Sequence, residues 1–261
     1  MSNLRVFFIG GVLSYRALFG WLSPWILIPT YLIAPIFQIL LFVYIGRSAH
    51  LESDEFYVVG NALQYTSLPC LFAMANTIGG ERWTQTLGVV LVSPASRLAL
   101  FLGRSLPVIL NGAVVGAFAF AAGSLILGVH VPASAIPPLG LVIAITAVSC
   151  TGLGLIGAAI GLRVRETAVL ANIFFGVLLV FCGVNVALSD VPNWMATVGR
   201  GLPLTHGIQA SRRLADGAGL DAVGGTVATE ALIGLVYAVL GYLLLRAFEF
   251  ESRRRATLET A

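Results

Sequence analysis

The sequence contains no lysine, and all fifteen of its basic residues are arginines. A phosphate-binding loop of the type Gly-x-x-x-x-Gly-Lys-Ser/Thr is therefore excluded, because its lysine contacts the nucleotide phosphates. Histidine is nearly as rare, since His50, His130 and His206 are the only three and lie far apart. This scatter favours neither a zinc protease nor a Ser/His/Asp triad, and no carboxylate pair indicates acid–base catalysis. We expect a chain that is not an enzyme and that binds no cofactor or metal.

Charge of either sign is also scarce. Only 10% of the 261 residues are charged and 58% are hydrophobic, whereas a soluble domain is about 25% charged and about 45–50% apolar. The mean hydropathy is +0.93. The uncharged runs reach the roughly 20 residues that a helix needs to cross a bilayer, and they lack the alternation of barrel strands. We predict an all-α membrane protein with one transmembrane domain over 1–261 and six transmembrane helices, near 25–45, 57–78, 106–129, 139–161, 168–188 and 227–245.

Small residues inside these spans predict close helix packing. Cys70, Cys150 and Cys182 have no metal-type spacing, so we interpret them as apolar packing residues outside any disulfide. The segment Gly152–Gly157 matches the Gly-x-Gly-x-x-Gly dinucleotide pattern. It lies inside an apolar span instead of following a strand, so it indicates close contact between membrane helices.

The arginines predict the orientation. With the N-terminus inside, eleven of the fifteen fall in cytoplasmic segments and four in outer segments, which favours both termini in the cytoplasm of a cell inner (plasma) membrane protein. The outer segment 190–221 fits less well, because it contains Arg212 and Arg213. Residues 3–20 are interpreted as an amphipathic interfacial helix with Arg5 and Arg16 on one face, or else as a frayed tail.

Polar residues within the spans have two interpretations each. The amides could line a substrate path or could bond a neighbouring helix. Glu230, the one carboxylate well inside a predicted span, could mark an ion or proton site or could lie at the outer interface if its helix begins slightly later. The candidate path-lining amides are Asn61, Gln64, Asn111, Asn172 and Asn185.

The loop after the second span is the most informative segment. Glu81 and Arg82 end the span, and apolar residues follow at spacings of three and four until Ser93-Pro94. This pattern predicts a short interfacial helix over about 81–94. Its apolar stripe, which includes Trp83, Leu87 and Leu91, would pack on the membrane surface or in a groove of a soluble protein.

Here the chain resembles the type 2 ABC transporter permeases. The family pattern is matched by Glu81-Arg82, Thr86-Leu87 and Ser93-Pro94, while Trp83 and Gln85 depart from it. The resemblance implies that 81–94 is a coupling helix seated in a cleft of a separate ATPase. The residues implied in ATPase coupling are Glu81, Arg82, Trp83, Thr86, Leu87, Leu91, Ser93 and Pro94, with Arg163 and Arg165 on the next inner loop.

The region after the fifth span resembles the outer signature of the same family. It carries Val191-Pro192-Asn193-Trp194, Leu202-Pro203-Leu204-Thr205-His206 and Ala210-x-Arg212. The resemblance implies a re-entrant outer helical hairpin near 190–215 before the last span. Its marker residues are Pro192, Trp194, Pro203, His206 and Arg212.

The resemblance implies a permease that moves an amphipathic substrate, such as a drug or antibiotic, a lipid or a glycolipid, out of the cell. Its expected partners are two copies of an ABC ATPase that bind ATP and Mg, a second permease (identical or related) and the lipid bilayer, with no nucleic acid. The chain looks closest to daunorubicin-type and nodulation-type exporters. Three alternatives stay open: a secondary transporter, which needs intramembrane carboxylates and repeats; a channel, which needs a polar pore ring; and a sensory or assembly subunit.

Overall fold

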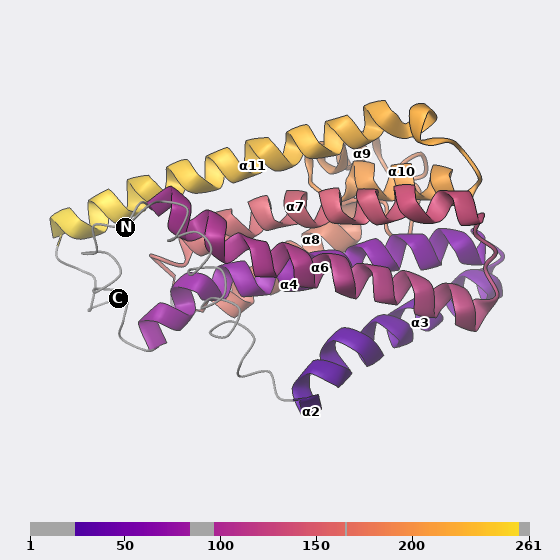
Figure 1. Ribbon diagram of the computed structural model, residues 1–261, viewed down its shortest axis with the longest axis horizontal. Coiled ribbons are helices and arrows are strands. Elements are labelled where there is room, and N and C mark those ends of the chain that lie inside the picture. The colour runs from indigo at the N-terminus through magenta and orange to yellow at the C-terminus, as the bar shows by residue number, and fades with distance from the viewer. Residues whose placement is uncertain (1–23, 84–96, 165, 256–261) are drawn as a thin grey trace.

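The structure is a computed structural model that describes residues 24–83, 97–164 and 166–255. These residues form helices and no strand. The long helices run side by side, and α11 extends along one edge of the bundle (Figure 1). The elements in chain order are α2 (Pro24–Leu27), the π-helical segment η1 (Ile28–Ile33), α3 (Ala34–Ala49), α4 (Asp54–Trp83), α6 (Arg97–Leu127), the 3-10 turn η2 (Ala133–Ala135), α7 (Ile136–Ile160), α8 (Thr167–Phe181), α9 (Asn193–Gly201), α10 (Thr205–Ala215) and α11 (Leu220–Arg255).

Four described segments are long and apolar enough to cross a membrane, by length and composition: Ile28–Ala49, Leu102–Leu127, Ala133–Ile160 and Leu220–Phe248. They correspond to the predicted spans 25–45, 106–129, 139–161 and 227–245. Each contains at least 22 residues, which at 1.5 Å per residue exceeds a hydrocarbon core of about 30 Å. The all-helical prediction is therefore confirmed for the described residues, with four candidate spans.

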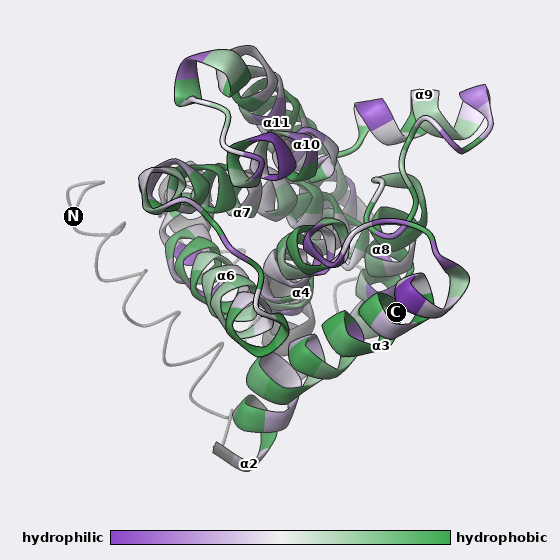
Figure 2. Cartoon of the chain, turned by 90° about the vertical axis from the view of Figure 1, so that its right-hand side faces the viewer, coloured by the Kyte–Doolittle hydropathy of each residue, from purple (hydrophilic) through white to green (hydrophobic). Residues whose placement is uncertain are grey.

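The predicted span 57–78 lies in α4, which is long enough but too polar to count among those four. Asn61, Gln64, Thr66 and Ser67 lower its hydropathy, and all four side chains are fully buried. The view from one end of the bundle shows why this is possible, because α4 lies at the centre (Figure 2). It contacts α3, α6, α7, α8 and α10. Its polar groups therefore meet other helices and not lipid.

The predicted span 168–188 is wrong at its C-terminal side. The helix ends at Phe181 after 15 residues, which is only about 22 Å of helix. Cys182 and the residues after it form a loop in which Gly183 has a φ of +74°. A residue in this left-handed region ends a helix, and glycine adopts it without strain.

The glycines of α7 confirm the predicted close packing. A Cβ atom added to Gly152 would lie 2.8 Å from the carbonyl oxygen of Gly234 in α11, and one added to Gly154 would lie 2.5 Å from that of Cys70 in α4. Backbone approaches this close require glycine, as at small-residue contacts of membrane helices. The three cysteines are free and buried, as the packing interpretation expected.

Two sequence predictions fall mainly outside the described residues. These are the interfacial helix 3–20 and residues 84–94 of the coupling helix. Glu81, Arg82 and Trp83 lie in the described backbone, where α4 continues unbroken to Trp83 and does not end at Glu81.

Candidate functional site

A helical hairpin occupies one end of the bundle. Its arms are α9 and α10, and residues 202–204 join them. We call this the hairpin end, because α11 begins there beside α9 and α10, whereas the last turns of α11 lie at the opposite end, the loop end (Figure 1). The predicted re-entrant region 190–215 thus contains two helices. One apolar face of α10 packs against α7 and α11, through a cluster that contains Ala210, Leu214, Leu139, Val142, Val223 and Val227.

A carboxylate from α11 caps the first turn of α10. The backbone N–H of Leu204 donates to Oε1 of Glu230 at 2.7 Å, and those of His206 and Gly207 donate to Oε2, both at 3.1 Å. The first N–H groups of any helix lack intrahelical partners and carry partial positive charge. Leu204, the N-cap residue, has no side chain that could accept them and has a φ of +88°. Glu230 therefore supplies the anionic acceptor that the local sequence lacks.

This arrangement corrects the expectation that Glu230 lies at the outer interface. α11 begins at Leu220, seven residues before the predicted span at 227, so Glu230 is almost three turns inside the helix. Its side chain has no exposed surface. Both carboxylate oxygens accept hydrogen bonds from backbone N–H groups, so Glu230 makes a structural contact with α10.

Arg212 binds backbone carbonyl oxygens, whereas Glu230 binds backbone N–H groups. Its guanidinium donates to the carbonyl oxygens of Gly183 and Val184, both at 2.9 Å, and to that of Phe56 at 3.1 Å. It also lies 3.4 Å from the centre of the Phe56 ring, a cation–π contact. The bonds to Gly183 and Val184 satisfy carbonyls just after the early end of α8, and the bond to Phe56 reaches the first turn of α4. The guanidinium of Arg212, an arginine that was unexpected on the outer side, is thus hydrogen-bonded to backbone carbonyls from two other segments.

The other marker residues of the hairpin have separate surroundings. Pro203 is buried, and its carbonyl oxygen accepts from the Cys182 thiol at 3.4 Å. Trp194 is 62% exposed and meets Phe181 edge-on at 6.0 Å between ring centres. The His206 side chain is half-buried, and its backbone N–H is one of the three that donate to Glu230. Pro192 is exposed and precedes α9 as its N-cap residue.

Two of the candidate path-lining amides come together in one hydrogen-bonded chain. Gln38 Nε2 of α3 donates to Asn61 Oδ1 at 2.8 Å, and Asn61 Nδ2 donates to Asn185 Oδ1 at 2.8 Å. Gln64 lies on the same helix as Asn61 and donates to the Phe175 carbonyl oxygen at 3.0 Å. These bonds join α4 to α3, to α8 and to the loop after α8.

The remaining two candidates lie apart from that chain. Asn172 is exposed on α8, and its side chain donates to the Ala168 carbonyl oxygen of its own helix at 2.9 Å. Asn111 is half-buried on α6. A role in lining a path stays a prediction for all five amides.

An ion pair joins two segments at the loop end. Arg163, in the loop between α7 and α8, pairs with Glu251 of α11. Its guanidinium also lies 4.3 Å from the centre of the Phe248 ring. Sequence reasoning singled out Arg163 but missed both partners, because it ended the last helix at 245. Arg165 lies outside the described residues.

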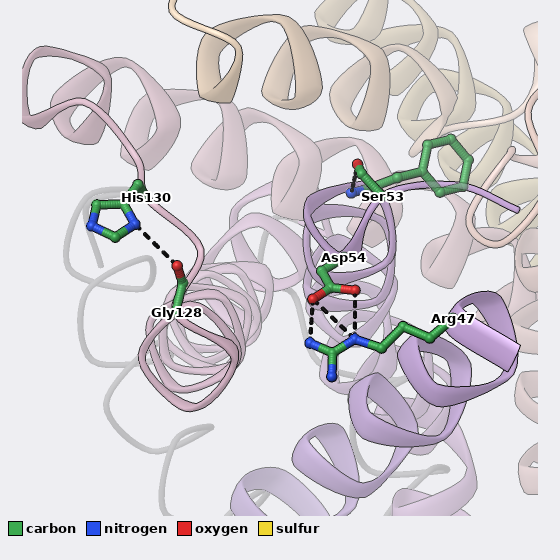
Figure 3. A network of polar contacts seen from close by, with 6 residues as sticks. Arg47, Ser53, Asp54, Gly128 and His130 are labelled. Atoms are coloured by element: carbon green, nitrogen blue, oxygen red, sulfur yellow. Dashed lines mark hydrogen bonds and ion pairs between the residues drawn. The ribbon is translucent and has the colours of Figure 1, made fainter. Parts of the chain in front are cut away.

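A second ion pair lies at the hairpin end, between α3 and α4 (Figure 3). Arg47 Nε donates to the two Asp54 carboxylate oxygens at 3.0 and 3.2 Å. Both side chains are partly exposed. The hydroxyl of Ser53 accepts the backbone N–H of Phe56 at 3.3 Å and caps α4. The pair joins the last turn of α3 to the first residue of α4.

The fold and these contacts define a multi-pass helical membrane protein in which Glu230 and Arg212 form hydrogen bonds with backbone groups. A comparison with protein families identifies it further. Residues 53–243 match the family described as ABC-2 family transporter protein, and the chain belongs to this family. The resemblance to type 2 ABC transporter permeases is thereby confirmed. The chain is a permease subunit of an ABC transporter, and the family implies an ABC ATPase as the partner that carries the ATPase activity. A comparison with curated proteins finds no match.

Proposed function

We propose that this permease belongs to an exporter that moves an amphipathic substrate, such as a drug or antibiotic, a lipid or a glycolipid, out of the cell. The observation that carries the proposal is the family match over residues 53–243. Two permeases, identical or related, would combine with two ATPase copies that bind ATP and Mg. The chain would reside in the cell inner membrane with both termini in the cytoplasm, in accord with the bias of its arginines.

In this proposal the chain crosses the bilayer six times. α4 and α8 are added to the four candidate spans, since α4 is enclosed by other helices and the loop after α8 is bonded by Arg212. Irregular backbone is tolerated at membrane depth only where protein covers it. The hairpin would be re-entrant, because Leu204 at its tip bonds to Glu230, ten residues along α11 from Leu220. Ten helical residues span about 15 Å, half of the hydrocarbon core.

In this proposal the force that drives transport acts on the loop end of the bundle. Closure of the ATPase subunits would push on the 81–94 helix and on the loop at Arg163–Glu166, and the spans would tilt to open a path outward. Glu81 and Arg82 would hold the coupling helix at the membrane edge. The apolar stripe with Leu87 would seat in the ATPase.

The test compares two substitutions in that helix. Leu87→Asp places a charge on the apolar stripe, whereas Gln85→Asp places the same charge about 200° away around the helix. We expect Leu87→Asp to abolish ATPase binding and ATP-dependent transport in membrane vesicles, and Gln85→Asp to retain both. Transport that persists without ATP, or ATPase binding that survives Leu87→Asp, would contradict the proposal.

A further inference from the structure

α11 is attached to both ends of the molecule by charged side chains. At the hairpin end Glu230 caps α10, and at the loop end Glu251 pairs with Arg163 while Phe248 stacks on the same guanidinium. The two carboxylates lie 21 residues apart on one helix, which corresponds to about 31 Å. One element thus contacts both the inner loop next to the ATPase and the tip of the outer hairpin.

The segment between these attachments is suited to move as one body. α11 contains no proline, the most frequent cause of a sharp kink in a helix. Glycines bring it against α7: a Cβ atom added to Gly234 would lie 2.7 Å from Cα of Ser149, and one added to Gly241 would lie 3.0 Å from the Ile156 nitrogen. Larger side chains, among them Leu155 and Leu245, extend the same interface toward the loop end, so α11 packs on α7 along the length between its two attachments.

The Glu230 attachment is stronger than the Arg163–Glu251 attachment, and this difference decides which of them can break while the chain stays folded. The Glu230 carboxylate is fully buried and accepts three N–H groups, so its removal would leave buried donors without partners, which is strongly destabilising. The Arg163–Glu251 pair is partly exposed, with 49% and 36% of the side-chain surfaces accessible, and exposed ion pairs contribute little to stability. The outer attachment is fixed, while the inner one can be broken without unfolding the chain.

We propose that α11 is a mechanical link between the two faces of the transporter. Glu251 is the positioning residue that receives the displacement of the 161–166 loop, and Glu230 is the one that passes it to the hairpin. The proposal rests on the proposed function, which supplies the displacement. The competing route runs along the chain itself, from the 161–166 loop through α8 and residues 182–192 to α9.

The experiment places a reporter cysteine on the hairpin and breaks the inner attachment. Val198 of α9 is 47% exposed, whereas the three native cysteines are at most 1% exposed and give little background. Val198→Cys is labelled with a hydrophilic maleimide in the complete transporter in lipid nanodiscs, without nucleotide and with Mg-ATP and vanadate. In the otherwise unchanged protein we expect the labelling rate of Val198→Cys to depend on nucleotide. Glu251→Arg should abolish that dependence. The swapped pair Arg163→Glu/Glu251→Arg should restore it. Asp54→Asn, which breaks the pair with Arg47 away from α11, is expected to keep the full response.

Each outcome tests either the mechanical link through α11 or the proposed function on which it rests. A response that persists in Glu251→Arg would overturn the link and favour the route through α8. Loss in Glu251→Arg without recovery in the swapped pair would also overturn it, because the charge pairing would not be the cause. A parent protein that transports with ATP but shows no change at Val198→Cys would reject the link alone. A parent that shows no ATP-dependent transport would reject the proposed function itself.

Discussion

Gly154→Ala tests the packing at the centre of the bundle. The added Cβ atom would lie 2.5 Å from the carbonyl oxygen of Cys70 and 2.9 Å from Cβ of Met74. A carbon and a carbonyl oxygen in contact are separated by about 3.3–3.6 Å. Neither neighbour can rotate away, since one is a backbone atom and the other is a Cβ atom. α7 and α4 would have to separate by about 0.8 Å or more.

The magnitude follows from comparison with a second glycine of the same helix. Gly140 also lies within α7, and a Cβ atom added there would meet nothing within 4 Å. Both substitutions gain the roughly 1 kcal/mol by which alanine is favoured over glycine in a helix. Only Gly154→Ala incurs the overpacking cost of about 1–3 kcal/mol. The difference between the two variants therefore isolates the packing cost.

The native cysteines supply the assay. Cys70, Cys150 and Cys182 are buried and free, so a thiol-reactive dye reports their exposure as the purified protein is heated. We expect Gly140→Ala to unfold at or above the parent temperature and Gly154→Ala to unfold several degrees below Gly140→Ala, at about 2–4 °C per kcal/mol for a chain of this size. Equal unfolding temperatures for the two variants would refute the close approach of α7 to α4.

Three further predictions concern polar contacts. Arg212→Lys keeps the charge but loses the planar fork and the stacking on Phe56, so we expect a loss of about 1.5–3 kcal/mol in the same thermal assay; an unchanged unfolding temperature would mean that the carbonyls after α8 do not need the guanidinium. Asn61→Ala breaks the buried amide chain and should lower the free energy of unfolding by about 1–3 kcal/mol. Asn172→Ala removes an exposed side chain and should change it by no more than about 0.5 kcal/mol. The reverse order would contradict the burial of α4. Asp54→Asn should cost less than about 1 kcal/mol, because its ion pair is partly exposed, and a larger loss would show that the pair fixes the α3–α4 connection.

The sequence was sufficient to predict the four long apolar helices, because each has a long run that is almost free of charge. It was less reliable where protein replaces lipid around a helix. α4 carries Asn61, Gln64, Thr66 and Ser67 within its apolar run, and nothing local indicates that other helices surround it. The early end of α8 was missed for a related reason. The run after Phe181 is also largely apolar, but its backbone bonds with Arg212, which lies 29 residues beyond Gly183 in the chain.

The hairpin region was recognised from its motifs, but its attachment was not. Glu230 was visible in the sequence as a single charge in an apolar span, and Arg212 as one of two adjacent arginines in an outer segment. Their partners are backbone groups that any residue could supply, so no side-chain pattern reveals them. Glu251 was missed because the last helix is about ten residues longer than its uncharged run. Contacts of this kind depend on tertiary structure and leave no periodic signal.

Glu230 and Arg212 follow one physical rule. Between Phe181 and Thr205 the chain leaves α8 and later begins α10, so it has unpaired carbonyls at the first point and unpaired N–H groups at the second. A cation, Arg212, meets the carbonyls, and an anion, Glu230, meets the N–H groups. In a low-dielectric interior an unpaired backbone group is costly, and a charged partner forms stronger hydrogen bonds than a neutral one. An isolated charge in an apolar membrane sequence can thus mark a break in the helical backbone elsewhere in the chain. Here one break precedes the hairpin and the other lies at its tip, and each charge connects the hairpin to the bundle.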